Sequence, residues 1–420
     1  MKNDVLGKEL LARGLVYQNG GGTVEEILAE PRTFYLGIDP SADSIHMGNL
    51  VPIILAKHLV DAGHTPVLLV GGGTGLIGDP KESGERPLLD ETIVAKNAAA
   101  IKAQLSSIIE KTNLQVVNNA EWLQQVGLLV FLRDIGKYFS VNQLVKRDLI
   151  KKRLETDEDS ISYTEFTYSL LQAYDYLELN QKYGVNLQIG GSDQWANIIS
   201  GVDLVRRKEA KSVYALTTPI VIDRVTGKKF GKSEGNAVWL DAAKTSSFQF
   251  YQFWINVSDA NVEEYLKIFT FLSLQAIEDL LAAHTAAPEK RQAQQTLAKE
   301  VTTFVHGAEA AASAERASLL LYGGDETVIL TAADIQLITA ELPQKTVTTS
   351  ALEEGVSVVN MLVETELASS KKEAQRLIEG GGVAVNDKTV DISYTITTAD
   401  AVSGLVRLRK GKKMAVLIVE

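Results

Sequence analysis

The chain has 420 residues, which is too long for one ordinary hydrophobic core, so we expect two or three domains. Hydrophobic residues make up 45% and charged residues 23%, a globular balance that excludes a disordered or fibrous chain. The formal net charge of −11 means that any contact with nucleic acid must come from a local basic patch. Without cysteine there can be no disulfide, no thiolate nucleophile and no cysteine zinc site.

The sequence carries no signal for a membrane or for export. Residues 1–16 mix lysine, aspartate and glutamate with leucine, so this segment lacks the unbroken apolar core of a signal peptide. Apolar runs such as residues 67–70 are far too short to span a bilayer. We therefore expect a cytoplasmic protein that does not contact membranes.

From about residue 33, strand-like and helix-like segments alternate and are separated by glycine or polar turns. In chain order these segments are 34–38, 49–59, 66–70, 91–109, 185–189 and 195–206. The alternation predicts an α/β domain over residues 1–230 with a parallel, Rossmann-like sheet. Ligands of such sheets bind at the carboxyl ends of strands, where the polar turns after Ile38 and Ile189 fall.

The second half of the chain has a different pattern. Strand signals become rare after residue 245, so we expect residues 231–342 to contain a basic loop and a helical domain. Residues 343–350 are polar and lack periodicity, which favours a linker over residues 343–354. A small α+β domain is expected over residues 355–420.

Residues 37–49 combine a strand end, a capped turn and a helix start, and their composition suits phosphate binding. His46 and Ser41 can donate hydrogen bonds to phosphate oxygens, and Gly48 leaves room for close approach of a nucleotide. For an isolated tripeptide, however, a histidine that only caps the helix or lies on the surface is the favoured alternative.

A second segment, residues 228–233, reads Lys-Lys-Phe-Gly-Lys-Ser and places three lysines in one loop. A solvated basic loop is an alternative interpretation. A P-loop is excluded, because that motif requires glycine at the position occupied by Thr226.

Together and in this order, the two segments resemble the HIGH and KMSKS signatures of class I aminoacyl-tRNA synthetases. They stand here as His46-Met47-Gly48-Asn49 and Lys229-Phe230-Gly231-Lys232-Ser233. The similarity is to bacterial-type tyrosyl-tRNA synthetases and covers nearly the whole chain, including Tyr35 and residues 71–80, 166–175, 187–195 and 248–256. The resemblance implies an enzyme that activates L-tyrosine with ATP to tyrosyl-adenylate, releases diphosphate, and transfers tyrosine to the 3′ end of tRNA(Tyr).

The amino-acid site can be examined residue by residue. Tyr168, Gln172 and Asp175 have the spacing i, i+4, i+7, which places them on one face of a helix. Their neighbours are mostly apolar, which favours burial around a polar ligand over a solvated helix face. The resemblance implies that the tyrosine hydroxyl meets Asp175 and Tyr35, that its ammonium group faces Tyr168, Gln172 and Asp79, and that its carboxyl end is supported by Gln194.

For the nucleotide, the resemblance implies in-line attack of the tyrosine carboxylate on the α-phosphate, assisted by positioning and charge stabilisation. The catalytic residues would be His46, Ser41, Lys229, Lys232 and Arg86, and Mg²⁺ would bind mainly through ATP oxygens, with no metal held by the protein alone. Asp39 and Asp193 resemble the family's partners of the ribose or of other polar groups, with simple helix N-caps as the alternative. The expected ATP contacts are Gly37, Asp39, Ser41, His46, Gly48, Asn49, Gly191, Asp193, Lys229, Phe230, Gly231, Lys232 and Ser233.

Two positions depart from the family pattern. The last position of the first signature is Asn49, which can still donate hydrogen bonds. The loop over residues 81–86 is one residue shorter, which leaves the role of Lys81 open, whereas Arg86 aligns from the downstream side and could reach the diphosphate.

The tail resembles an S4-type RNA-binding module, with a helix through residues 370–376, a glycine turn at 380–382 and a strand over 383–386. Its basic residues would give an acidic protein the local patch that RNA phosphates require, and a solvated basic hairpin is the alternative. The expected RNA contacts are Lys371, Lys372, Arg376, Arg407, Arg409, Lys410, Lys412 and Lys413.

Two alternatives to the whole assignment stay open. A tryptophan-specific synthetase would share the fold and both signatures, but its substrate has no hydroxyl for Asp175 and Tyr35 to bind. A non-catalytic RNA scaffold on a synthetase fold would have no reason to keep His46, Lys232 and Asp175. The resemblance also implies a homodimer.

Overall fold

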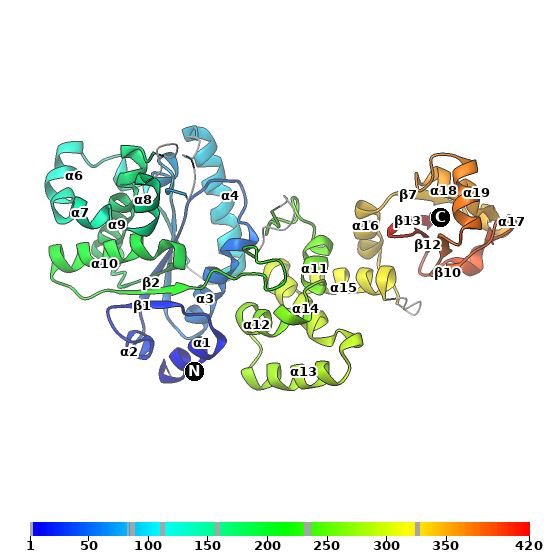
Figure 1. Cartoon of the computed structure of the whole chain (residues 1–420), viewed down its shortest axis with the longest axis horizontal. Helices are drawn as coiled ribbons and strands as arrows, with labels where there is room; N and C mark the ends of the chain where they lie inside the picture. Colours follow the sequence, from blue (N-terminus) through cyan, green and yellow to red (C-terminus); the bar gives the residue numbers. More distant parts are fainter. Residues whose placement is uncertain are drawn as a thin grey trace. The chain divides into compact units, whose positions relative to one another are not determined.

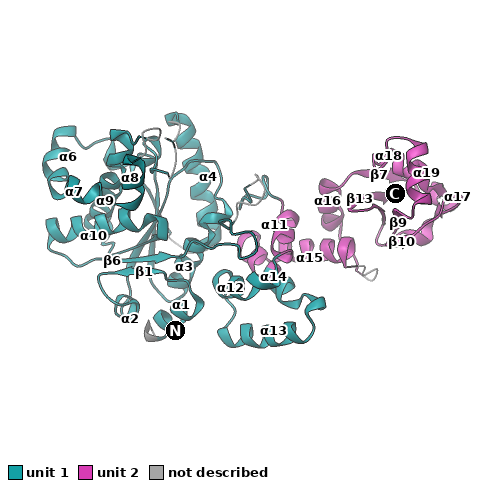
Figure 2. Cartoon of the chain, viewed as in Figure 1, with its two compact units in different colours: residues 1–245, 257–297 teal, residues 246–256, 298–420 magenta. Residues whose placement is uncertain are grey.

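The computed structural model describes residues 3–81, 84, 89–109, 114–155, 160–230, 237–323 and 328–420. The chain divides into two compact units (Figure 2). Unit 1 comprises Met1–Thr245 and Val257–Leu297, and unit 2 comprises Ser246–Asn256 and Ala298–Glu420. The helices that we expected as one domain over residues 231–342 are thus divided between the two units.

Unit 1 is built on a six-stranded sheet in the order β1-β6-β5-β2-β3-β4. Every pair from β6 to β4 is parallel, and β1 joins the edge in antiparallel orientation, which confirms the expected parallel sheet. The strands are β1 (Gln18–Gly20), β2 (Thr33–Ile38), β3 (Thr65–Val70), β4 (Gln115–Asn118), β5 (Leu187–Gly191) and β6 (Tyr214–Thr218).

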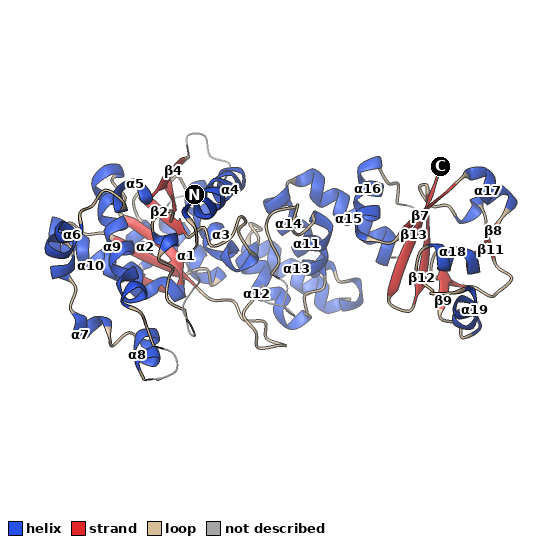
Figure 3. Cartoon of the chain, turned by 90° about the horizontal axis from the view of Figure 1, so that it is seen from above, coloured by secondary structure: helices blue, strands red, loops and turns tan. Residues whose placement is uncertain are grey.

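Helices cover both faces of this sheet (Figures 1 and 3). On one face, Tyr35, Val67 and Leu69 pack into an apolar core with side chains of α9 and α10. On the other face, α3 and α4 contact the strands. The main helices of unit 1 are α1 (Asn3–Arg13), α2 (Val24–Leu28), α3 (Leu50–Asp61), α4 (Glu91–Ile109), α5 (Ala120–Leu123), α6 (Leu128–Asp134), α7 (Val141–Leu144), α8 (Asp148–Leu154), α9 (Tyr163–Tyr183), α10 (Trp195–Glu209), α12 (Asp259–Phe269) and α13 (Leu274–Ala286).

Helix α9 carries three of the expected site residues and has strong local signals at both ends. Ser162 Oγ accepts from the backbone N–H of Glu165 at 3.2 Å, and the Glu165 side chain accepts from Ser162, which completes a capping box. Glu165 also forms a fully buried ion pair with Arg153, at 3.1 Å. The helix ends at Gly184, whose φ of 66° is a left-handed conformation that glycine adopts without strain.

Unit 2 begins with helices and ends with a small α+β domain. Its five-stranded sheet has the order β10-β9-β12-β13-β7, and β8 and β11 form a separate two-stranded sheet. Its helices are α11 (Ser247–Ile255), α15 (Ala308–Tyr322), α16 (Ala332–Glu341), α17 (Thr349–Glu354), α18 (Val358–Glu364) and α19 (Lys371–Glu379), and α14 (Gln292–His306) crosses the boundary between the units. Its strands are β7 (Gln344–Val347), β8 (Val356–Ser357), β9 (Val383–Val385), β10 (Lys388–Thr389), β11 (Thr395–Ile396), β12 (Leu405–Lys410) and β13 (Lys413–Val419).

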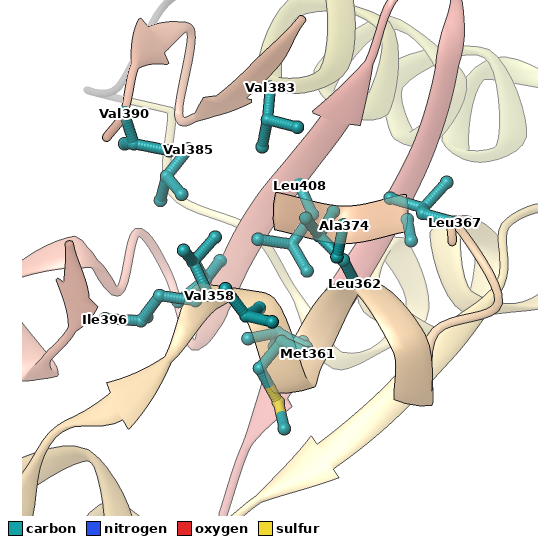
Figure 4. Packing of buried hydrophobic residues seen from close by; sticks show 14 of the residues in the cluster. Val358, Met361, Leu362, Leu367, Ala374, Val383, Val385, Val390, Ile396 and Leu408 are labelled. Carbon is teal, nitrogen blue, oxygen red and sulfur yellow. The ribbon is translucent and has the colours of Figure 1, made fainter. Parts of the chain in front are cut away.

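The small domain has a continuous apolar core. Figure 4 shows side chains of α18, α19 and the strands meeting there, among them Val358, Leu362, Ala374 and Leu408. A second cluster joins Leu405 and Val416 of the sheet to α15 and α16. Both faces of the sheet are therefore covered within unit 2.

The expected linker over residues 343–354 is wrong. β7 pairs in parallel with β13, with Gln344 opposite Val416 and Val347 opposite Val419, and α17 buries Leu352 completely. In this edge strand only Val347 is buried, while Gln344, Lys345 and Thr346 are exposed. The segment therefore lacks the apolar alternation by which a strand is found in a sequence.

Candidate active site

A cavity of about 1000 Å³ opens at the carboxyl ends of the parallel strands in unit 1. β2 has β3 on one side and β5 on the other, so the strand order reverses direction at β2. In parallel sheets, ligands bind beside the strand ends at such a reversal. All the expected amino-acid and ATP contacts that the structure describes line the cavity, namely Tyr35, Gly37, Asp39, Ser41, His46, Gly48, Asn49, Asp79, Tyr168, Gln172, Asp175, Gly191, Asp193, Gln194, Lys229 and Phe230.

Four expected contacts, Arg86, Gly231, Lys232 and Ser233, lie outside the described residues. Lys81, whose role the shortened loop left open, lines the cavity, and its backbone carbonyl accepts a hydrogen bond from Arg153 at 3.2 Å. The base of the loop is thereby tied to the buried ion pair at the start of α9.

Asp175 lies at the buried end of the cavity, where its two carboxylate oxygens accept hydrogen bonds from different side chains. Trp122 Nε1 donates to Oδ1 at 2.7 Å, and Asn119 Nδ2 donates to Oδ2 at 2.9 Å. Burial raises the pKa of Asp175 to about 8, and these two hydrogen bonds oppose that rise. The carboxylate is held in place and has lone pairs left for a ligand.

Polar atoms without a hydrogen-bond partner surround the same space. Tyr35 Oη, Gln172 Oε1 and Gln188 Oε1 are buried and have no protein partner, and all three residues line the cavity. Burial raises the pKa of Tyr35 well above its ordinary value, and the nearby Asp175 adds to this, so the hydroxyl stays protonated. Because unpaired buried polar atoms are costly, their concentration here indicates that a polar ligand completes the site.

A second carboxylate, Asp79, is held by two side chains of the segment after β5. Gln194 Nε2 donates to Oδ2 at 2.7 Å and Asn197 Nδ2 donates to Oδ1 at 3.1 Å. Burial raises the pKa of Asp79 to about 6, while these hydrogen bonds lower it. A cationic group in the cavity would be attracted to this carboxylate.

Asp39 accepts hydrogen bonds from two further elements. Thr74 Oγ1 donates to Oδ1 at 2.7 Å, and Tyr168 Oη donates to Oδ2 at 2.6 Å. Neither Asp39 nor Asp193 is a helix N-cap here. The 3₁₀ helix η1 (Met47–Asn49) is capped by His46, and the N-caps of η4 (Ser192–Gln194) and α10 are Gly191 and Gln194. Asp39 and Asp193 therefore face the cavity without capping these helices.

His46 caps a helix and also lines the cavity, so capping and the expected phosphate contact do not exclude each other. Its Nδ1 accepts from the backbone N–H of Gly48 at 2.9 Å, so it caps η1, and in the neutral ring the hydrogen is carried by Nε2. A Cβ atom at position 48 would lie 2.7 Å from His46 Cε1, so any larger residue there would have to displace the ring. The same ring lines the cavity and contacts the edge of Trp239.

Backbone hydrogen bonds join the first signature segment to residues 238–240, which follow the second signature in the sequence. Met47 donates to the carbonyl of Val238 at 2.8 Å, and Leu240 donates to the carbonyl of Ile45 at 2.9 Å. On the other side of the second signature, Phe230 donates to Val221 at 2.9 Å, and its buried ring packs on Phe269. Lys229 therefore extends from an anchored hairpin at the rim of the cavity.

Several residues of this site were missed in the sequence, among them Thr74, Asn119, Trp122 and Gln188. Thr74 and Asn119 follow β3 and β4, and the sheet order brings Thr74 beside Asp39 and Asn119 beside Thr74 and Asp175. The only usable signal was their position shortly after these strands. Trp122 and Gln188 gave no signal of their own.

Comparisons with known proteins give the family of the chain. The family model described as "tRNA synthetases class I (W and Y)" matches residues 28–323, and the model described as "Tyrosine--tRNA ligase SYY-like C-terminal domain" matches residues 334–418. A tyrosine–tRNA ligase of Roseiflexus castenholzii is 45% identical over 96% of this chain and 97% of its own. One from Streptococcus uberis is 45% identical over 97% of both chains. The chain belongs to the tyrosine–tRNA ligase family.

Solved structures show how far the fold alone separates this family from its neighbours. A C-terminally truncated mitochondrial tyrosyl-tRNA synthetase of Aspergillus nidulans has a TM-score of 0.66 at 29% identity, covering 74% of this chain and 92% of its own. A tryptophanyl-tRNA synthetase of Encephalitozoon cuniculi reaches 0.54 at 14% identity, covering 80% of this chain and 92% of its own. The fold is common to both, so tyrosine–tRNA ligases are distinguished by their side chains.

The basic residues of the C-terminal domain are not equivalent. Lys371, Lys372 and Arg376 are exposed on α19, and Arg409, Lys412 and Lys413 are exposed on the β12–β13 hairpin. Lys410 Nζ lies 2.8 Å from Glu373 Oε1, which joins the end of β12 to α19. Seven of the eight expected RNA contacts are therefore at least partly exposed, on two elements in direct contact.

Arg407 is the exception, and its expected place on the RNA-facing surface is wrong. Its side chain is only 4% exposed, donates to the carbonyls of Leu320 and Leu321, and lies 3.0 Å from Asp387 Oδ2. The last carbonyls of a helix have no partner within the helix, and Arg407 supplies one at the end of α15. The residue stabilises packing inside unit 2.

No metal cluster and no membrane span is found in the described part of the chain. There, no three His, Cys, Asp or Glu side chains gather in a way that could hold a metal ion. Within the same residues, no helix has both the length and the apolar character that crossing a bilayer requires.

Proposed function

We propose that this protein activates L-tyrosine with ATP and transfers the tyrosyl group to the 3′ end of tRNA(Tyr). One observation carries the amino-acid assignment: the buried Asp175 carboxylate and the unpaired Tyr35 hydroxyl face the same cavity. A phenol can donate to the carboxylate and accept from the hydroxyl at the same time. Family membership supports the same substrate.

As alternative substrates, tryptophan and phenylalanine fit Asp175 and Tyr35 less well than tyrosine does. An indole N–H can only donate, so it would satisfy Asp175 but leave Tyr35 without an acceptor. Phenylalanine would leave the Tyr35 hydroxyl unpaired and would give Asp175 no donor beyond Asn119 and Trp122, and an unpaired buried polar group costs free energy. The site therefore favours tyrosine through the groups it would otherwise leave unpaired.

The other end of the amino acid would be held by groups that match its charges. The ammonium group would lie near Asp79, Tyr168 and the unpaired amide oxygen of Gln172, which can all accept hydrogen bonds. Gln194 donates to Asp79 and would hold that carboxylate in position beside the ammonium group, while Gln194 itself would support the carboxyl end of tyrosine.

In the first reaction, a carboxylate oxygen of tyrosine attacks the α-phosphorus of ATP. The bond from this phosphorus to the bridging oxygen breaks, and diphosphate leaves with the electron pair. Nε2 of His46 would donate to the phosphates, with Ser41 beside it, and Lys229 would balance the charge that develops on diphosphate. Lys232 and Arg86 are proposed for the same role, and the nucleotide would also meet Gly37, Asp39, Gly48, Asn49, Gly191 and Asp193.

Magnesium would accompany ATP and reduce the charge of its phosphates. The ion would be held chiefly by ATP oxygens. The protein's own contribution is to orient the two reactants and to exclude water from the buried end of the cavity.

In the second reaction, a terminal hydroxyl of tRNA attacks the activated carbonyl, and AMP leaves. We propose that α19 and the β12–β13 hairpin bind RNA phosphates through their exposed lysines and arginines. Lys412→Ala with Lys413→Ala is expected to weaken tRNA binding and to reduce its dependence on salt by about one to two released ions. Unchanged salt dependence would remove the hairpin from the RNA-binding surface. We place the reaction in the cytoplasm.

We also propose that the protein is a homodimer that uses the surface of α6. Leu128 and Leu129 are 71% and 80% exposed, and Val130 and Leu132 are exposed beside them. An apolar patch of this kind is typical of a protein contact. Leu129→Asp is expected to give a monomer in sedimentation, and a wild-type protein that sediments as a monomer would contradict the proposal.

The proposed activity is tested by amino-acid-dependent exchange of diphosphate into ATP. We expect exchange with tyrosine and none with phenylalanine or tryptophan at equal concentration. Exchange with tryptophan alone would favour the tryptophan-specific alternative. Well-folded protein that shows no exchange with ATP and Mg²⁺ would leave the non-catalytic RNA scaffold as the explanation.

A further inference from the structure

The hydroxyl group of Thr74 lies between two groups of polar side chains in the cavity. Its Oγ1 is 2.7 Å from Asp39 Oδ1 and 2.9 Å from Asn119 Nδ2. The same amide nitrogen is 2.9 Å from Asp175 Oδ2. One hydroxyl and one amide therefore connect the carboxylate that would bind the phenol with the carboxylate that faces the nucleotide.

The direction of each hydrogen bond in this series, from Asp39 through Thr74 and Asn119 to Asp175, is determined by the surrounding contacts. Asn119 Oδ1 accepts from the backbone N–H of Gly73 at 2.7 Å, so Nδ2 is the atom that faces Thr74 and Asp175. Both hydrogens of that nitrogen are used, one for each neighbour. Because the Thr74 oxygen accepts one of them, its single hydrogen points to Asp39.

The surroundings leave little freedom for another arrangement. Thr74 is 2% exposed, Asn119 is fully buried and Asp175 is 1% exposed. A Cβ atom at position 71 would lie 2.0 Å from Asp39 Oδ1 and 2.5 Å from Thr74 Oγ1, so the glycine at this position lets the two side chains meet. In a buried network, loss of one member leaves its neighbours without partners.

We propose that Thr74 is a positioning residue that couples the two ends of the cavity, so that choice of the amino acid and use of ATP depend on the same hydroxyl. The inference rests on the proposed function. Thr74 touches no reacting atom in this scheme. It orients the Asp39 carboxylate directly and, through Asn119, the Asp175 carboxylate.

Three substitutions separate this role from simple packing. Thr74→Val removes the hydroxyl at nearly constant volume, and Thr74→Ser keeps the hydroxyl but removes the methyl group. Thr65→Val is the control, because Thr65 is exposed at the opposite end of β3. Diphosphate exchange is measured with tyrosine and with phenylalanine over a range of ATP concentrations.

For Thr74→Val we expect two changes together. The kcat/KM for tyrosine falls by about tenfold to a hundredfold, as for loss of a hydrogen bond to a charged group. The preference for tyrosine over phenylalanine falls as well, and kcat at saturating tyrosine decreases. The kcat/KM of Thr74→Ser should stay within about threefold of wild type, and that of Thr65→Val should equal wild type.

Several results would overturn the coupling. An effect of Thr74→Val on amino-acid preference alone, or on kcat alone, would assign Thr74 to one end of the cavity. A loss in Thr74→Ser without a loss in Thr74→Val would assign its role to the methyl group, and equal losses in both would assign it to packing. If Thr74→Val does not fold, Asn119→Ala interrupts the same series of hydrogen bonds. A normal kcat at saturating tyrosine in Asn119→Ala would then contradict the proposal. A wild-type protein without tyrosine-dependent exchange would instead refute the proposed function.

Discussion

The two ends of the cavity are constructed differently. At the buried end, Asp175 and Tyr35 project from a helix and a strand, and short hydrogen bonds from Trp122 and Asn119 fix the carboxylate. At the outer end, His46 and Lys229 lie on turns and are held mainly by backbone pairing, His46 with the distant Trp239 and Lys229 with the nearby Ile222. The buried end is suited to recognition, and the outer end to contact with phosphates.

This difference has a physical reason. Discrimination by a hydroxyl requires polar atoms that are buried, oriented and unpaired until the substrate arrives, because water would otherwise replace the missing group. Stabilisation of phosphates requires donors and cations that can reach charges developing on a large, solvated ligand. Substitutions at the two ends should therefore differ in whether binding or turnover is lost.

The largest expected effect is at the buried end. Asp175→Asn would turn an amide N–H₂ group toward one of the two donors, Asn119 or Trp122, and would remove the charged acceptor for the phenol. We expect kcat/KM for tyrosine to fall by about two to three orders of magnitude, as for truncation of a buried charged partner. Diphosphate exchange measures it, and a fall below about fivefold would show that Asp175 does not bind the substrate hydroxyl.

At the outer end, two replacements of His46 separate its capping from its donor function. The amide oxygen of His46→Asn can replace Nδ1 as the cap, whereas the amide of His46→Gln reaches the position of Nε2. If Nε2 donates to phosphate, His46→Asn should lower kcat by about a hundredfold or more, and His46→Gln should lower it less. Thermal unfolding serves as the control, and the opposite order of activities would assign His46 to capping alone.

A smaller effect is expected where the first signature segment meets Trp239. Trp239 contacts His46 at its edge, and Lys244 Nζ lies 4.9 Å from the centre of the indole ring. Trp239→Leu removes both contacts but retains the backbone pairing, so we expect a decrease in kcat of about threefold to tenfold with little change in tyrosine affinity. Weaker tyrosine binding with unchanged kcat would place Trp239 in the amino-acid site instead.

The smallest expected effect is a shift in pH dependence. The pKa of Asp175 is raised to about 8 by burial, and its carboxylate form is the better acceptor for the phenol, so tyrosine should bind more tightly as pH rises through this value. Trp122→Phe removes a hydrogen bond that favours the charged form, so the midpoint should move to higher pH. Tyrosine KM measured between about pH 6 and 9 in both proteins tests this, and a midpoint moved to lower pH would contradict it.

Local sequence was sufficient for features that depend on spacing within one element. The stripe of Tyr168, Gln172 and Asp175 follows from helix geometry, and the apolar run of residues 66–70 predicted a buried strand. Features that depend on the order of strands were not accessible, because Thr74 and Asn119 meet Asp39 and Asp175 only after the sheet has formed. Arg407 shows the same limit. An arginine that faces solvent and one that binds the carbonyls at the end of α15 cannot be told apart in the sequence.

Direct binding of tyrosine in the absence of ATP, measured by calorimetry on wild type, Asp175→Asn and His46→Asn, tests the contrast between the two ends most directly. We predict that His46→Asn binds tyrosine like wild type although it exchanges diphosphate poorly, and that Asp175→Asn loses binding by about a hundredfold. Loss of tyrosine binding in His46→Asn, or its retention in Asp175→Asn, would contradict the division of the cavity into a recognition end and a phosphate end.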